Sequence, residues 1–156
     1  MNRILSAIGV SAGVLLGSVM LPGLASAEPS ALPSDAQVAG AQADLCASKV
    51  TSSGYVHIYW NTGCNSQPIC STTGDDSNYG NSQGCAGDDD NRATSLLNNG
   101  YSGGLDDVRF YRLADHGGGS VCVGNQQYVS NLANWSFTSG INADNRISSH
   151  KWVSSC

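Results

Sequence analysis

Basic residues are scarce in this chain of 156 residues. Lysine and arginine together number 7, against 12 aspartates and glutamates, and the formal net charge is −5. Proteins that bind nucleic acids or anionic membranes need clustered lysine and arginine to contact phosphate groups. We therefore exclude both of these partners, and we expect a cation or a basic protein to suit this acidic chain better.

Long hydrophobic runs are also missing after the first 27 residues. The largely apolar stretch 4–21 follows Asn2 and Arg3 and leads into Leu24-Ala25-Ser26-Ala27, the small-residue cleavage pattern of a secretory signal peptide. An uncleaved anchor is the alternative, but glycine and serine dilute the stretch. We expect residues 1–27 to be removed and the protein to be secreted. Residues 28–45, rich in Ala, Pro, Ser and Gln, are predicted to form a disordered leader.

Helical periodicity is absent too. No stretch of twelve or more residues combines a helical apolar period with capping signals, whereas short β-branched or aromatic runs such as 55–60 and 108–113 alternate with Gly, Asn, Ser and Asp. The predicted class is all-β, with Trp60, Trp135 and Trp152 mostly in the core. The chain also lacks a paired-carboxylate, Cys/His or zinc-type constellation, so we predict no enzyme activity and structural roles for the histidines.

Cysteines, by contrast, are frequent. The mature part would hold all of them: Cys46, Cys64, Cys70, Cys85, Cys122 and Cys156. An even number of cysteines in an exported chain indicates disulfides, which would substitute for a large core. Six cysteines allow 15 pairings, and the sequence does not choose among them.

A hexapeptide occurs twice in the chain. Asp90-Asn91-Arg92-Ala93-Thr94-Ser95 returns as Asp144-Asn145-Arg146-Ile147-Ser148-Ser149. Upstream, the four-residue runs that end at Tyr59 and Tyr111 are similar, and Cys70 and Cys122 follow their tyrosines at the same spacing. We infer two homologous units within one domain, at about 46–103 and 104–156, and place Cys70 and Cys122 at equivalent positions.

Each hexapeptide offers carboxylate, amide and hydroxyl oxygens, which are the ligands that a hard cation such as calcium prefers. The alternative is an ordinary loop in which short polar side chains bond to the backbone. The duplication of the hexapeptide favours the calcium site.

These motifs resemble those of the βγ-crystallin superfamily. Its Greek-key unit begins with an aromatic residue, places a second aromatic five positions later and a glycine two after that, and carries an (Asn/Asp)-(Asn/Asp)-x-x-(Ser/Thr)-Ser calcium motif. The second unit matches with Tyr111, His116 and Gly118, whereas the first has Cys64 and Ser66 after Tyr59. The resemblance implies a sandwich of two Greek-key motifs, stapled here by disulfides.

The resemblance also implies how calcium would be held. The two motifs of a domain are paired, and each supplies ligands to two neighbouring sites. The implied ligands are the side chains of Asp90, Asn91, Asp144 and Asn145, the hydroxyls of Thr94 and Ser148, and the carbonyls of Arg92 and Arg146.

The cysteines, the expected secretion and the opening Ser53-Gly54-Tyr55-Val56-His57-Ile58-Tyr59 carry a looser resemblance. It links mainly residues 46–100 to the secreted metallopeptidase inhibitors of actinobacteria, which share this fold. It implies an extracellular peptidase as partner of a monomeric protein. The candidate inhibitory loop is Cys64-Asn65-Ser66-Gln67-Pro68-Ile69-Cys70, because two bridged cysteines would hold it in one shape. An ordinary inter-strand loop is the alternative. For the whole protein, a calcium-stabilised structural or stress module and a small secreted toxin are the alternatives.

Overall fold

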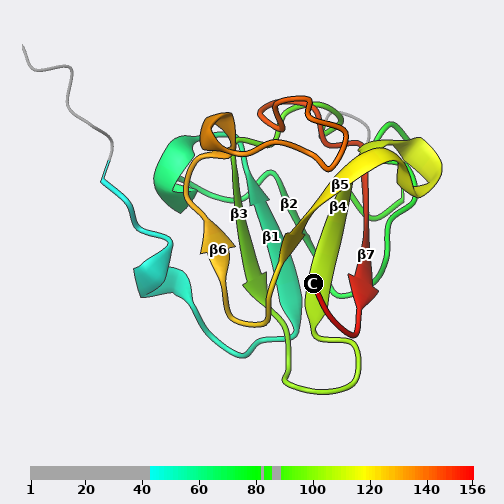
Figure 1. The fold of residues 1–156 in the computed structure, drawn as a ribbon. Coiled ribbons are helices and arrows are strands. Elements are labelled where there is room, and N and C mark those ends of the chain that lie inside the picture. Colours follow the sequence, from blue (N-terminus) through cyan, green and yellow to red (C-terminus); the bar gives the residue numbers. More distant parts are fainter. Residues whose placement is uncertain (1–42, 82, 86–88) are drawn as a thin grey trace, which may run out of the picture. The chain divides into compact units, whose positions relative to one another are not determined.

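The computed structural model describes residues 43–81, 83–85 and 89–156, which form two antiparallel β-sheets (Figure 1). One sheet has the order β2-β1-β3-β6 and the other the order β5-β4-β7. The strands are β1 Tyr55–Tyr59, β2 Cys70–Thr72, β3 Ser95–Asn99, β4 Asp107–Leu113, β5 Gly117–Val123, β6 Tyr128–Val129 and β7 Ser149–Val153. Short 3₁₀ turns lie at η1 Ala47–Lys49, η2 Thr62–Cys64, η3 Ala114–His116 and η4 Leu132–Asn134. The predicted all-β class with two sheets is confirmed.

The predicted signal peptide, 1–27, and residues 28–42 of the predicted leader lie outside the described residues. The last three residues of that leader, 43–45, are hydrogen-bonded to the domain. Leu45 N donates to the Gly63 carbonyl at 2.8 Å, and Asn65 Nδ2 donates to the Ala43 carbonyl at 2.6 Å. None of the helices in the described ranges is long and apolar enough to cross a membrane.

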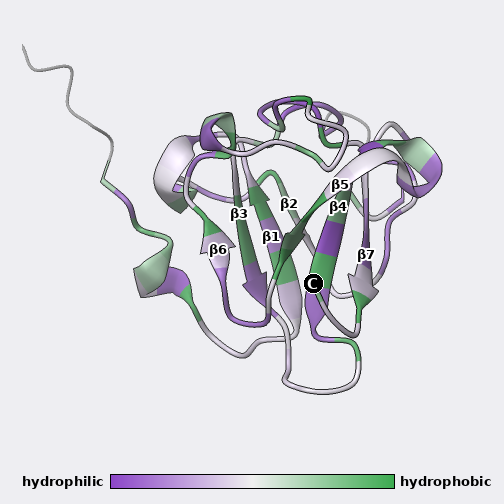
Figure 2. Ribbon diagram, viewed as in Figure 1, coloured by the Kyte–Doolittle hydropathy of each residue, from purple (hydrophilic) through white to green (hydrophobic). Residues whose placement is uncertain are grey.

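The hydrophobic core lies between the sheets, because alternate residues of each strand point inward. Val56 and Ile58 of β1 belong to the same buried cluster as Val108 and Phe110 of β4. Hydrophobic and hydrophilic residues alternate along β4, as the residue colouring shows (Figure 2). The prediction that the tryptophans are mostly core residues is wrong: Trp60 is 54% and Trp135 is 44% exposed.

Each half of the chain contributes a segment to the other half's sheet. The short strand β6, from the second half, pairs with β3 in the first sheet, and Asp76, from the first half, forms an isolated bridge with His150 of β7. In both halves the last strand returns beside the first, β3 beside β1 and β7 beside β4. This return is the mark of a Greek key.

The hairpins that open the two halves share a backbone conformation although their sequences differ. Gly63, Cys64 and Ser66 have φ values of 67°, 50° and 66°. In the second half the corresponding Asp115, His116 and Gly118 have φ values of 55°, 60° and 78°. The first hairpin therefore adopts the same left-handed turns, although Cys64 and Ser66 depart from the sequence pattern of the second.

The prediction that Cys70 and Cys122 are equivalent is wrong by one residue. Cys70 pairs with Ile58 across the first hairpin, whereas Cys122 pairs with Arg109, one position before the residue that corresponds to Ile58. A slip of one residue exchanges the faces of a strand. Cys70 accordingly lies in the core and Cys122 does not.

Three disulfides join all six cysteines, as expected for an exported chain. They connect Cys46 to Cys64, Cys70 to Cys85, and Cys122 to Cys156. The first bridge lies in a second buried cluster together with Tyr59 and Leu97. The predicted disulfide-stapled domain is therefore confirmed.

Candidate calcium site

The two hexapeptides lie against each other. Asn91 N donates to the Ile147 carbonyl at 3.0 Å, and Asn145 N donates to the Ala93 carbonyl at 2.9 Å. The second hydrogen bond repeats the first with the two copies exchanged. Copies that lie 54 positions apart in the sequence thus form a single structure with approximate twofold symmetry.

The conformation of each loop depends on its asparagine. Asn91 has φ 57° and Asn145 has φ 52°, a left-handed conformation that asparagine adopts more readily than most residues. Each amide also donates to the preceding carboxylate: Asn91 Nδ2 to Asp90 Oδ2 at 2.7 Å, and Asn145 Nδ2 to Asp144 Oδ2 at 3.0 Å. The amide oxygens Oδ1 therefore face away from their own carboxylates.

The hydroxyl group of each hexapeptide approaches the amide oxygen of the other. Thr94 Oγ1 lies 3.4 Å from Asn145 Oδ1, and Ser148 Oγ lies 3.4 Å from Asn91 Oδ1. Both distances are long for a bond from a hydroxyl donor. Two candidate ion positions result, one at each hydroxyl–amide pair. Each combines oxygens from both copies, which lie near one another without a strong hydrogen bond between them.

One oxygen of each aspartate lacks a partner. Asp90 Oδ1 and Asp144 Oδ1 are buried without a hydrogen bond among the described residues. Ser53 Oγ and Trp152 Nε1 are also buried without a hydrogen-bond partner in the described ranges, but they belong to uncharged groups. A buried carboxylate oxygen without a partner is unfavourable, and a bound ion is one accepted explanation for it. The donor set and the two unpartnered oxygens both fit calcium.

The arginine side chains of the hexapeptides make contacts of their own. The Arg92 guanidinium lies over the Trp60 ring, 3.8 Å from its centroid, and Arg146 Nη1 donates to the Asn142 carbonyl at 3.3 Å. The role predicted for Arg92 and Arg146 concerns their backbone carbonyls and stays a prediction.

The final serine of each hexapeptide has a structural function that sequence reasoning missed. Ser95 Oγ donates to the Asn61 carbonyl at 2.6 Å and accepts from Cys64 N at 3.0 Å. Ser149 Oγ likewise donates to the Leu113 carbonyl at 2.7 Å and accepts from His116 N at 3.3 Å. Each serine fastens the folded hairpin of its own half, which places the hexapeptide at a fixed point of the sheet.

The candidate inhibitory loop is held at both ends by disulfides, because Cys64 is bonded to Cys46 and Cys70 to Cys85. Lys49 Nζ supports the loop by donating to the carbonyls of Cys64 at 2.6 Å and Ser66 at 3.0 Å. Near the other end, Ile69 N donates to the Ile58 carbonyl at 2.8 Å. Asn65, Pro68 and Ile69 are half-buried, whereas Ser66 and Gln67 are exposed at the tip.

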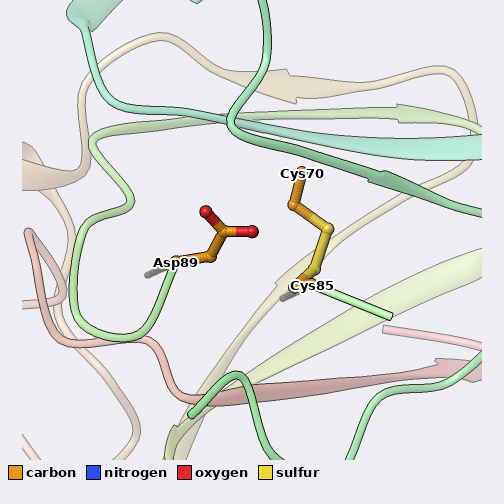
Figure 3. Close-up of side chains that lie close together, drawn as sticks. All are labelled: Cys70, Cys85 and Asp89. Carbon is orange, nitrogen blue, oxygen red and sulfur yellow. A yellow bond between two sulfur atoms is a disulfide. The ribbon is translucent and has the colours of Figure 1, made fainter. Parts of the chain in front are cut away.

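A further cluster of potential ligands is a disulfide next to a carboxylate. Cys70, Cys85 and Asp89 present their ligand atoms within 4.8 Å of one another. Figure 3 shows that the two sulfur atoms are bonded to each other, which removes the thiolates that a metal would need. The cluster is therefore not a metal site in this oxidised form.

Comparisons with known proteins give only distant similarities. No protein-family model matches the sequence, and no curated protein matches it. Among solved structures, a chain from work on the evolution of the eye-lens βγ-crystallin domain fold aligns with a TM-score of 0.49 and 15% identity, covering 67% of this chain and 90% of that one. A βγ-crystallin from an archaeon aligns with a TM-score of 0.44 and 22% identity, covering 64% of this chain and 96% of that one.

Proposed function

We propose that the protein is a secreted, non-catalytic domain that binds calcium at the paired hexapeptides. The observation that carries this proposal is the pair of buried, unpartnered oxygens, Asp90 Oδ1 and Asp144 Oδ1, at equivalent positions of the two copies. The Asn91 and Asn145 side chains, the Thr94 and Ser148 hydroxyls and the backbone carbonyls of the two arginines would complete the ligand sets. Calcium accepts such mixed oxygen ligands.

Bound calcium would connect the two halves of the domain. Each candidate ion position combines oxygens from both copies, so an ion there would neutralise a carboxylate and link residues that are distant in the sequence. An ion that binds only the folded state stabilises it, by about 2.7 kcal/mol per site at a concentration 100 times Kd. The proposed role is accordingly structural.

Replacement of Thr94 and Ser148 by alanine tests this site. Each substitution removes one ligand oxygen, and we expect the double variant to bind calcium about tenfold more weakly or worse, which corresponds to about 1.4 kcal/mol. Isothermal titration calorimetry of the oxidised domain measures the affinity. The matched control is Thr51→Ala with Ser154→Ala, which removes the same two hydroxyl types at exposed positions. Equal affinity of the double variant and the parent would show that the ligand assignment is wrong.

Peptidase inhibition is a second candidate function, favoured by the loop 64–70. Two disulfides and the Lys49 hydrogen bonds hold this loop with Ser66 and Gln67 exposed at its tip. A loop that is already ordered binds an active-site groove with little further loss of conformational entropy. The proposed partner is an extracellular zinc peptidase of the thermolysin type.

We expect the oxidised domain, in calcium-containing buffer, to reduce the activity of such a peptidase stoichiometrically and to leave a serine peptidase active. Replacement of Gln67 by alanine should raise the inhibition constant at least tenfold, whereas the exposed Gln127→Ala variant should behave as the parent does. The residual activity in a titration at high enzyme concentration measures both effects. Full activity of the zinc peptidase at a molar excess of the domain would exclude this candidate and leave the structural module and the toxin as alternatives.

A further inference from the structure

A cavity of about 390 Å³ lies near the C-terminal ends of β3 and β7, whereas the hexapeptides end at the first residue of each of these strands. Two aromatic side chains line it, Tyr101 from the β3–β4 connection and Trp152 from β7. Asp75 and Leu105 also line it. The volume is in the range of small-ligand sites. In Figure 1 the β3–β4 connection lies at the opposite end of the strands from the loop before β7.

Glycines let both aromatic rings pack directly against the backbone. A Cβ atom on Gly54 would lie 2.6 Å from Tyr101 Cε2, and one on Gly100 would lie 2.6 Å from Trp152 Cζ3. The backbone under Tyr101 is itself anchored, because Gly54 N donates to the Asn99 carbonyl at 2.8 Å. Tyr101 is nevertheless 65% exposed, so its ring lines the cavity and does not belong to the core.

The carboxylate in this cavity is fixed but not neutralised. Asp75 Oδ1 accepts a hydrogen bond from the backbone N of Trp152 at 2.8 Å, which ties the Asp75 side chain to β7. Within the described part of the chain, Asp75 Oδ2 has no hydrogen-bond partner and the carboxylate no ion pair. Asp75 is exposed, so water solvates this oxygen when the cavity is empty.

We infer that this cavity binds an organic cation, an ammonium or guanidinium group on an apolar stem. Aromatic rings attract cations through their faces, and a nearby carboxylate adds a direct charge interaction. Leu105, 64% exposed, offers apolar surface for the stem. The net charge of −5 favours the approach of cations over that of anions. The cation could belong to a basic side chain of a partner polypeptide or to a small free amine.

The test is an NMR titration of the oxidised domain with three probes: N-acetyl-arginine N-methylamide, its citrulline counterpart and tetramethylammonium. Citrulline keeps the shape of arginine and lacks its charge. We expect the arginine probe to bind at about 1 mM and to shift the Trp152 indole and Tyr101 signals, and the citrulline probe to bind at least tenfold more weakly. Tighter binding of tetramethylammonium than of the arginine probe would favour a free amine as the natural ligand, and the reverse would favour a basic side chain.

Two variants separate the site from general charge attraction. Asp75→Asn keeps an acceptor oxygen for Trp152 N and removes the charge, so it should weaken binding of the arginine probe at least tenfold. The exposed Asp115→Asn variant removes the same charge elsewhere and should bind as the parent does. Equal affinity for arginine and citrulline probes, or an unchanged affinity in Asp75→Asn, would overturn the inference.

Discussion

Loss of the disulfide between Cys70 and Cys85 is expected to destabilise the domain by about 4 kcal/mol or more, a larger effect than loss of the bridge between Cys122 and Cys156. Closing a loop with the sequence separation of 15 found here restricts the unfolded chain by about 3 kcal/mol. Cys70 and Cys85 are 5% and 0% exposed and belong to the main core, so replacing both with alanine also removes buried sulfur from it. Urea unfolding of the Cys70→Ala/Cys85→Ala variant measures the change.

The bridge between Cys122 and Cys156 is the natural comparison. Its sequence separation of 34 gives it an entropic advantage of only about 0.7 kcal/mol over the shorter loop. Cys156 is exposed, and its neighbourhood stays attached when the bridge is removed: Cys156 N donates to Asp107 Oδ2 at 2.7 Å, and Arg109 Nη2 donates to the Ser155 carbonyl at 3.2 Å. A greater loss for the Cys122→Ala/Cys156→Ala variant than for the core pair would show that loop entropy outweighs burial here.

The sequence was sufficient to predict the class of the fold because its short β-branched and aromatic runs alternate with turn residues, and the internal repeat marks strand positions that match between the two halves. The two tyrosines and the two hexapeptides occupy matching register positions: Tyr59 pairs with Ser95, and Tyr111 with Ser149. The strands therefore begin and pair at matching positions in the two halves, and a comparison of the two halves recovers these positions. The meeting of the two hexapeptides, which the crystallin resemblance implied, is also observed in the backbone hydrogen bonds of Asn91 and Asn145.

The disulfide pairing and the cavity could not be predicted from the sequence. Cys46 meets Cys64 because the segment before β1 packs on the outer face of the first sheet, beside Tyr59 and Leu97. That contact depends on tertiary packing and leaves no periodic signal. The prediction that Cys70 and Cys122 are equivalent was wrong for a related reason. The second hairpin is one residue shorter than the first, and equal spacing in the sequence concealed this.

A buried histidine connects the two halves and should make stability depend on pH. His150 is 0% exposed, and its Nε2 lies 2.9 Å from the Gly74 carbonyl. A carbonyl can only accept, so Nε2 carries the proton, and Nδ1 of the neutral ring accepts from the Tyr79 hydroxyl at 2.7 Å. Burial lowers the pKa of His150, although the Gly74 hydrogen bond and the Asp76 and Asp75 charges oppose this shift.

The sign of the pH dependence follows from that lowered pKa. Between about pH 6.5, where histidine titrates in the unfolded chain, and the lower pKa of the folded state, the unfolded chain binds the extra proton and the folded one does not. The unfolding free energy should therefore be greatest above pH 6.5 and should fall as the pH decreases below it. His57, whose pKa is lowered by burial and by the Lys49 charge, contributes in the same direction. A His57→Gln variant measures that share.

Replacement of His150 by phenylalanine should remove the larger part of this pH dependence and cost about 2–5 kcal/mol at pH 7.5, because the Tyr79 hydroxyl and the Gly74 carbonyl both lose their partner inside the protein. Burial raises the pKa of Tyr79 well above its usual value. Because this hydroxyl is buried, leaving it without a partner should cost more free energy than leaving the Gly74 carbonyl without one. The double variant Tyr79→Phe/His150→Phe removes that hydroxyl as well, so it should be more stable than His150→Phe alone. Urea unfolding at pH 5.0 and 7.5 measures the stability of the parent, of these two variants and of His57→Gln. The contradicting result is an unfolding free energy that is equal at pH 5.0 and pH 7.5 in both the parent and the His57→Gln variant. His150 would then not stay neutral in the folded protein, and the Tyr79 hydroxyl would not be its donor.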